Sequence, residues 1–167
     1  SRARLIRLGE DAERVHVTGA PGLDGLTDAP RHPRDQLLAE LGLDPGTPTA
    51  LVLFHPVLQE AQGARDQIAA IFDALHRDGW NYVVLMPNAD AGSDDLSKPI
   101  EGSARPSAPR IVSLPRPQFL DFMAGMDALV GNSSSGIIEA ASFGTPVINI
   151  GSRQNLRERN ANVIDVP

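Results

Sequence analysis

Short apolar segments alternate with longer amphipathic segments along most of this 167-residue chain. The apolar segments have strand length and are rich in Val, Ile and Leu, and they lie at residues 15–17, 49–54, 82–86, 111–112, 127–130 and 146–150. Between them, the spacing of apolar residues predicts helices over residues 34–41, 64–76, 94–101, 117–126 and 135–143. Apolar strands joined by helices form parallel sheets that are covered on both faces. We therefore expect a single α/β domain over residues 1–167, a doubly wound Rossmann-like parallel sheet.

The composition narrows the partners of such a domain. Hydrophobic residues make up 41% of the chain, enough for a core, and the formal net charge is −6. That charge argues against a general nucleic-acid binder, which normally carries a basic face. No apolar run reaches the ~20 residues that cross a bilayer, and the polar start lacks the apolar centre of a secretory signal. With no cysteine for disulfides, these features favour a cytoplasmic protein without a membrane partner.

Polar segments that follow the expected strands indicate where a ligand would bind. In doubly wound folds, ligands bind beyond the carboxyl ends of the strands. Polar or glycine-rich residues follow five of the expected strands, at residues 19–22, 55–56, 87–90, 131–135 and 151–154. Polar loops also occur in α/β domains without ligands, but this many on one edge favour a site assembled from loops.

The segment at residues 131–139, GNSSSGIIE, leads from an apolar strand into a helix and is the best candidate anion site. Unpaired amide groups and the positive end of the helix dipole meet at such a junction, and glycine lets an anion approach the backbone. Gly136 stands where a capping box would need Ser or Thr, so Glu139 has no capping role. Its carboxylate is therefore available to a ribose diol. The alternative is an exposed glutamate that the helix dipole favours.

Four motifs together resemble the carboxy-terminal half of the UDP-N-acetylglucosamine 2-epimerases, most closely the hydrolysing branch. They are FHP at 54–56, PNADAGS at 87–93, GNSSSGIIE at 131–139 and GTPVINIGSRQ at 144–154. The resemblance implies a glycosyltransferase-B-type fold of two Rossmann-like halves, of which this chain supplies the second. It also implies anti elimination of UDP from UDP-N-acetylglucosamine, followed by hydration of the resulting 2-acetamidoglucal to N-acetylmannosamine.

The resemblance assigns roles to several residues of these motifs. Ser133 and Ser134 match diphosphate-binding serines, whereas Ser135 is assigned to capping the helix. Glu139 matches the acid that holds the ribose hydroxyls. His55 matches a histidine near the diphosphate and the sugar, where an imidazolium donates to phosphate or transfers a proton.

Four further residues are assigned with a competing interpretation. Asn88 and Asp90 match a loop near the uridine, although Asn-x-Asp is equally a good turn former. Arg153 and Arg157 would share one face if their segment is helical and would then bind the diphosphate, or they form a solvated basic patch. The family usually has glycine where this chain has Leu156, and a side chain there would alter the path of the loop.

Three histidines outside the motifs, His16, His32 and His76, are interpreted as ordinary surface or loop residues. No cluster of residues has the spacing of metal ligands, and the chemistry of the family needs no metal or redox cofactor. The carboxylates that perform acid–base chemistry in the family have no counterpart here, so the expected partner is an amino-terminal domain. The chain alone is then inactive. The alternatives are a stand-alone UDP-sugar-binding module, a non-hydrolysing epimerase or a sugar transferase, and homo-oligomerisation stays open.

Overall fold

The computed structural model describes residues 2–28, 31–55, 61–86 and 93–167. Its centre is a six-stranded sheet in which every neighbouring pair of strands is parallel. The strands are β1 (Thr49–Leu53), β2 (Asn81–Leu85), β3 (Arg110–Ile111), β4 (Ala128–Gly131), β5 (Val147–Ile150) and β6 (Val163–Val166). Their order, β3-β2-β1-β4-β5-β6, is that of a doubly wound Rossmann sheet. The direction of winding reverses between β1 and β4, which is where such folds bind ligands.

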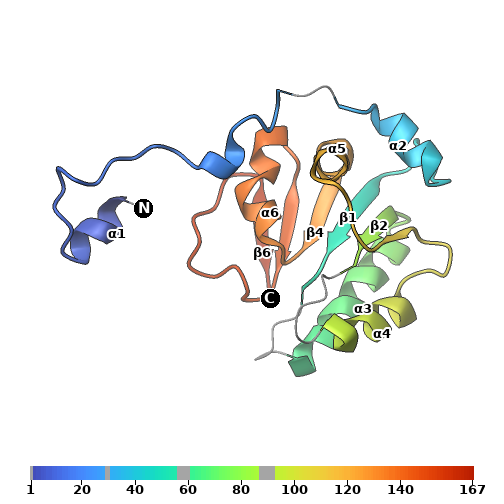
Figure 1. The fold of residues 1–167 in the computed structure, drawn as a ribbon. Coiled ribbons are helices and arrows are strands. Elements are labelled where there is room, and N and C mark those ends of the chain that lie inside the picture. Colours follow the sequence, from blue (N-terminus) through green and yellow to red (C-terminus); the bar gives the residue numbers. More distant parts are fainter. Residues whose placement is uncertain (1, 29–30, 56–60, 87–92) are drawn as a thin grey trace.

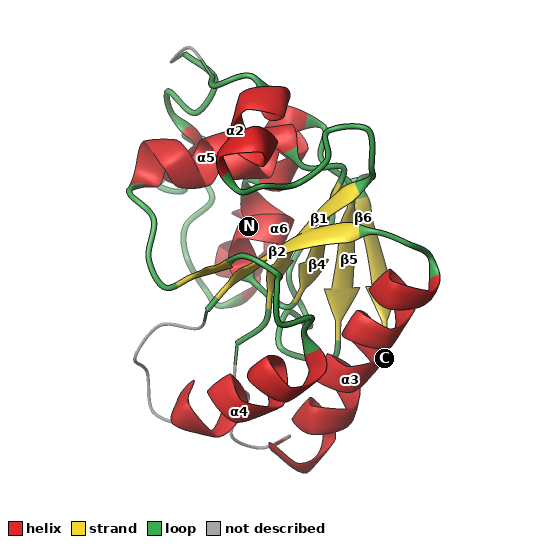
Figure 2. Ribbon diagram, turned by 90° about the vertical axis from the view of Figure 1, so that its right-hand side faces the viewer, coloured by secondary structure: helices red, strands yellow, loops and turns green. Residues whose placement is uncertain are grey.

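Helices pack on both faces of this sheet (Figures 1 and 2). One face carries α3 (Ala61–Arg77) and α4 (Ser93–Ser103), and the opposite face carries α2 (Arg34–Glu40), α5 (Arg116–Gly125) and α6 (Ser134–Ile138). Each face has its own buried core, because successive side chains of a strand point to opposite faces. Val52 of β1 packs in the core under α3, whereas its neighbour Leu51 packs in the core under α5. The expected fold class is therefore confirmed.

The structure corrects the expected elements at three places. Residues 15–17 form no strand, and Val17 is 76% exposed in a segment that joins no sheet. The helix expected over 135–143 is divided into α6 and the 3-10 helix η3 (Ala140–Phe143). The edge strand β6 was not expected, because the charged Asp165 interrupts its apolar pattern. In the structure its Ile164 is exposed.

The start of the chain lies apart from the sheet. Helix α1 (Arg2–Arg7) has no buried residue, and a long connection joins it to the short 3-10 helix η1 (Pro21–Leu23) at the side of the domain (Figure 1). Leu8, directly after α1, is 81% exposed. The sequence did not predict this helix. Within the described ranges, no helix has the length and apolar character needed to cross a membrane.

Candidate functional site

Strand β4 ends at Gly131, at the point where the winding of the sheet reverses. Gly131 has a φ of +144°, and a Cβ atom added there would lie 1.8 Å from the carbonyl oxygen of Leu53 at the end of β1. No residue with a side chain fits this position without moving one of the two strands. The glycine at the start of the predicted anion site therefore brings the ends of β1 and β4 together.

Asn132 connects the ends of three strands. Its side chain is buried, and Oδ1 accepts a hydrogen bond from the backbone N–H of His55 at 2.7 Å, while Nδ2 donates to the His55 carbonyl at 2.9 Å. Its own carbonyl accepts from Arg153 Nη1 at 3.0 Å and from Gln154 Nε2 at 2.8 Å. The loops after β1, β4 and β5 are therefore held as one unit. Asn132 is part of the motif at 131–139, but the sequence predicted no role for it.

The serines after Asn132 start α6. Ser133 is the N-cap of the helix, and its Oγ accepts from the backbone N–H of Ser135 at 3.4 Å and lies 2.8 Å from the Ser135 hydroxyl. The assignment of the capping role to Ser135 is therefore wrong, because that hydroxyl instead bonds to Ser133. Ser133 and Ser135 are both buried, whereas Ser134 is half-buried at the first position of the helix. Ser134 is thus the most accessible of the three.

Gly136 lets α6 lie close to the sheet. A Cβ atom at this position would lie 2.9 Å from Cγ1 of Val147 in β5 and 3.2 Å from Cδ2 of Leu129 in β4. Real Cβ contacts are rarely so short, so any side chain here would push the helix away from the strands. The glycine therefore fixes the first turn of α6 over the carboxyl end of β4.

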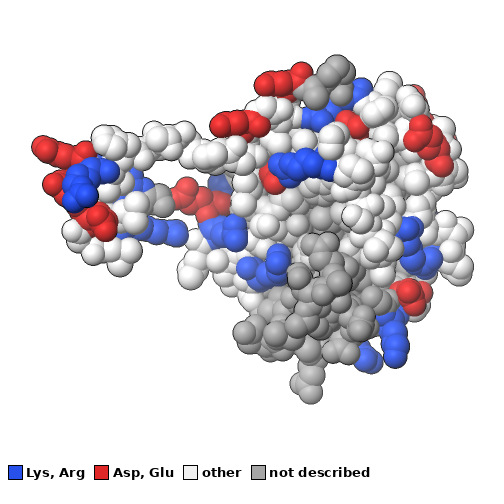
Figure 3. Space-filling view, viewed as in Figure 1, with Lys and Arg blue, Asp and Glu red and all other residues white. Residues whose placement is uncertain are grey.

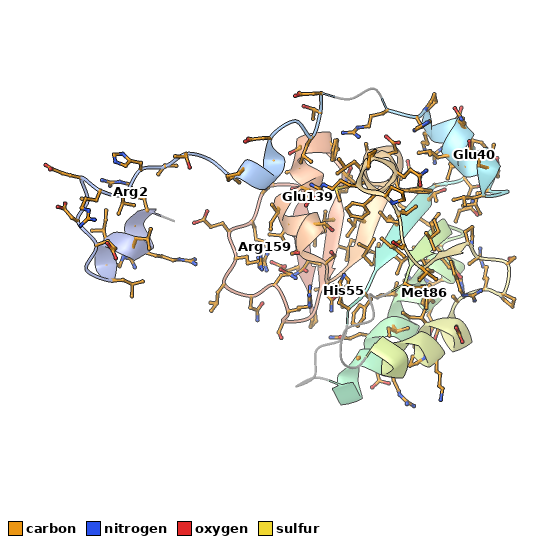
Figure 4. All side chains as sticks on the ribbon, in the orientation of Figure 1. Arg2, Glu40, His55, Met86, Glu139 and Arg159 are labelled. Carbon is orange, nitrogen blue, oxygen red and sulfur yellow. The ribbon has the colours of Figure 1, made fainter. Side chains whose placement is uncertain are left out.

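Glu139 lies at the break between α6 and η3, where it ends the first and precedes the second. Its side chain is only 16% exposed, and Nη1 of Arg116 lies 3.1 Å and 3.3 Å from its two carboxylate oxygens. The alternative of an exposed glutamate is therefore wrong, although Glu139 does precede the short helix η3. Figure 4 shows Glu139 beside α5 and α6, while His55 lies at the carboxyl ends of the strands.

The segment that carries Arg153 and Arg157 forms turns rather than a helix, so the two side chains do not share a helical face. Both arginines are exposed, and Arg153 donates to the Asn132 carbonyl while Arg157 bonds through its backbone N–H to Gln154. Leu156 has a φ of +67° and is 88% exposed. Leucine thus adopts here the left-handed conformation that glycine favours, and a changed loop path relative to the family stays a prediction.

Of the three remaining predicted site residues, the structure describes one. His55 is half-buried directly beyond β1, whereas Asn88 and Asp90 lie outside the described residues.

Two of the histidines interpreted as ordinary are in fact paired. His32 Nδ1 lies 2.6 Å from the buried carboxylate of Asp121, and His76 lies within α3, 2.7 Å from the hydroxyl of Tyr82. His16 is exposed, as expected.

Charged side chains of both signs lie on this side of the domain. On the face shown in Figure 3, the projecting N-terminal arm carries acidic and basic side chains together, and basic side chains also lie near the middle of the domain. Two hollows of about 400 and 380 Å³ lie beside Leu37 of α2 and beside Ile71 of α3, and neither is lined by a predicted site residue that the structure describes. The predicted residues that Asn132 connects, His55 and Arg153, lie instead at the edge formed by the strand ends.

The whole chain, residues 1–167, matches the sequence profile of the UDP-N-acetylglucosamine 2-epimerases. It belongs to this family. A curated relative, UDP-N,N'-diacetylbacillosamine 2-epimerase (hydrolyzing) from Legionella pneumophila, is 43% identical over 99% of this chain and 44% of its own. The chain thus spans less than half the length of this epimerase.

Solved epimerases share the fold. The Neisseria meningitidis UDP-GlcNAc 2-epimerase bound to UDP-GlcNAc has a TM-score of 0.70 and 15% identity, over 89% of this chain and 41% of its own. A Staphylococcus aureus structure, MnaA with UDP, has a TM-score of 0.66 and 20% identity, over 90% of this chain and 40% of its own. At these identities the likeness concerns the fold alone.

In this member of the epimerase family, sequence reasoning missed two residues that organise the candidate site. Asn132 lies inside the motif at 131–139, so its position in a strand-to-helix junction was available as a signal. Arg116 lies outside all four motifs, and only the folded chain brings it to Glu139, 23 residues away. The structure therefore adds both a tie between the strand ends and an ion pair.

Proposed function

We propose that this chain is the UDP-binding half of a hydrolysing UDP-N-acetylglucosamine 2-epimerase. The observation that carries the proposal is the way in which Asn132 holds His55, Arg153 and the start of α6 together where the winding reverses. Doubly wound folds bind nucleotides at this place. Membership of the family supports UDP as the nucleotide.

The diphosphate would bind at the start of α6. Ser134 is accessible there, Ser133 caps the helix through its hydroxyl, and the first amide groups of a helix are donors for an anion. Arg153, which Asn132 already holds beside this junction, would add a positive charge, and Arg157 is a weaker candidate because it lies further along an exposed turn. Charge-assisted hydrogen bonds of this kind are stronger than neutral ones.

The nucleoside would extend along α6. The carboxylate of Glu139 would accept hydrogen bonds from the ribose hydroxyls, and it lies five positions beyond Ser134, directly after the last residue of α6. Asn88 and Asp90 would contact the uridine from the loop after β2. These assignments rest on the motifs. With the nucleoside along α6, the hexose would lie on the other side of the diphosphate, near His55.

The reaction would begin with loss of the sugar's C2 proton and departure of UDP from C1, which leaves 2-acetamidoglucal. Negative charge grows on the diphosphate as the bond breaks, so fixed donors and cations aimed at its oxygens stabilise the transition state. His55 would donate to the departing phosphate or assist a proton transfer. Water then adds to the double bond to give N-acetylmannosamine. The acid–base carboxylates would come from an amino-terminal half, so this chain alone would bind UDP without turnover.

A second candidate substrate carries two acetamido groups. The relative that is 43% identical acts, by its name, on UDP-N,N'-diacetylbacillosamine. The UDP site would be the same for either sugar, because the difference lies at the hexose. Turnover of each sugar nucleotide by a full-length enzyme that contains this chain would distinguish them, and free sugar plus UDP would identify the hydrolysing reaction.

Titration calorimetry with UDP tests the site. Ser134→Ala and Glu139→Ala should each weaken binding by ~1 kcal/mol or more, through loss of charge-assisted hydrogen bonds. Ser107→Ala, in an exposed turn before β3, is the matched control and should bind UDP like the unchanged chain. Unchanged affinity in both site variants would reject the proposed site.

A further inference from the structure

Arg116 and Glu139 form an ion pair that the motifs do not predict. Arg116 is the first residue of α5, and Glu139 ends α6, so the pair joins the start of one helix to the end of another. The arginine side chain is 51% exposed, whereas that of the glutamate is 16% exposed. A carboxylate that is largely removed from water needs hydrogen-bond donors, and Arg116 is the donor seen among the described residues.

Arg116 occupies an unfavourable end of its own helix, whereas Glu139 ends α6 and also precedes η3. A helix disfavours a cation in its first turn and an anion at its end, because the peptide dipoles align along the axis. Helix α5 has no acidic residue in its first turn to offset Arg116. The preference of α5 therefore does not explain Arg116, and within the described part of the chain its guanidinium is paired with Glu139. Positions that break a local rule in this way are typical of functional sites.

The geometry of the contact leaves Glu139 able to bind a ligand. One guanidinium nitrogen, Nη1, contacts both carboxylate oxygens at 3.1 Å and 3.3 Å, and a carboxylate offers about four lone-pair sites. The contact fixes the orientation of the carboxylate, while each oxygen retains accepting capacity. A vicinal diol needs such a pair of oriented acceptors.

We propose that Arg116 is a positioning residue of the nucleotide site, which orients the Glu139 carboxylate for the two ribose hydroxyls. The inference rests on the proposed function, because it presumes that UDP binds along α6. Arg116 acts through Glu139, so its loss affects recognition of the ribose and not of the diphosphate. The Arg116 side chain is 51% exposed, so water can reach the contact when the guanidinium is removed, and we expect the substituted domain to stay folded.

The test compares UDP with its 2',3'-dideoxy analogue by titration calorimetry. Arg116→Gln should weaken UDP binding by about three- to tenfold and leave the affinity for the dideoxy analogue unchanged. Arg116→Lys should restore part of the loss, because a lysine keeps the charge without the fixed geometry of the guanidinium. Combining Arg116→Gln with Glu139→Gln should cost no more than Glu139→Gln alone. Arg77→Gln, which removes an exposed ion pair with Asp78 at the far end of α3, is the matched control.

The outcomes separate this inference from the function it rests on. If the unchanged chain binds UDP and Arg116→Gln weakens both nucleotides equally, or neither, Arg116 does not position Glu139 for the ribose and the inference is overturned. A gain in UDP affinity would also overturn it, because Arg116 would then compete with the ribose. If the unchanged chain binds neither nucleotide, the proposed function fails and the inference fails with it.

Discussion

Replacing Asn132 by alanine should destabilise the domain by about 2–4 kcal/mol. The side chain of Asn132 makes two hydrogen bonds to the backbone of His55, at 2.7 and 2.9 Å, and is 2% exposed. A buried donor or acceptor that loses its partner costs about 1–3 kcal/mol, and His55 is half-buried, so water would satisfy part of the loss. The donors from Arg153 and Gln154 bind the backbone carbonyl of residue 132 and would remain.

Urea unfolding followed by circular dichroism measures this effect. The midpoint should fall while the slope stays the same, because the native fold is kept. Asn155→Ala is the matched control, since Asn155 is exposed in the loop after β5, and should stay within about 0.5 kcal/mol of the unchanged chain. An effect of Asn132→Ala as small as that of the control would refute the role of Asn132 as the tie between the strand ends. Asn132→Asp distinguishes the contributions of the two hydrogen bonds. Its carboxylate still accepts from the His55 N–H, but it offers the His55 carbonyl an oxygen in place of the N–H donor.

Three further predictions concern single residues. Gly131→Ala should destabilise the chain by more than about 3 kcal/mol, measured by thermal unfolding, because its Cβ meets the carbonyl of Leu53; a change under about 1 kcal/mol would contradict the close approach of β1 and β4. Leu156→Gly should stabilise the chain by about 0.5 kcal/mol in urea, since relief of the positive φ exceeds the entropy that glycine adds to the unfolded state; a clear loss would show that the exposed leucine contributes packing. Hydrogen bonds from Arg159 lower the pKa of Asp165, so its contribution to stability is present above about pH 4 and is lost as the pH falls further; Asp165→Asn should flatten the fall in unfolding free energy between pH 5 and pH 3, and an unchanged slope would contradict this.

The sequence predicts the fold where a segment is long enough to bury a face. Residues 64–76 place four apolar side chains on one side, and the helix forms there with only its ends extended. Residues 15–17 offer two valines in three positions, which is too little to specify a partner strand, and they stay outside the sheet. Strand β6 pairs with β5 through its backbone although Asp165 and Ile164 are exposed, so its pairing depends on the neighbour more than on its own pattern.

At the candidate site, too, features of adjacent residues could be predicted from the sequence, whereas contacts between distant segments could not. The strand-to-helix junction at 131–139 was visible because its glycines and serines are adjacent in the sequence. Spacing did not decide which serine caps α6, since Ser133 and Ser135 are two positions apart and bond to each other. The contact between Asn132 and His55 spans 77 residues, and nothing in either local segment indicates it. Only the order of the strands brings these residues together.

Soaking a crystal of this chain in UDP tests directly whether the nucleotide binds at the start of α6. Density for the diphosphate is expected at the first turn of α6, within hydrogen-bond distance of Ser134 and Arg153, with the ribose beside Glu139. Density for UDP elsewhere on the chain, with the ends of β1 and β4 empty, would contradict this expectation.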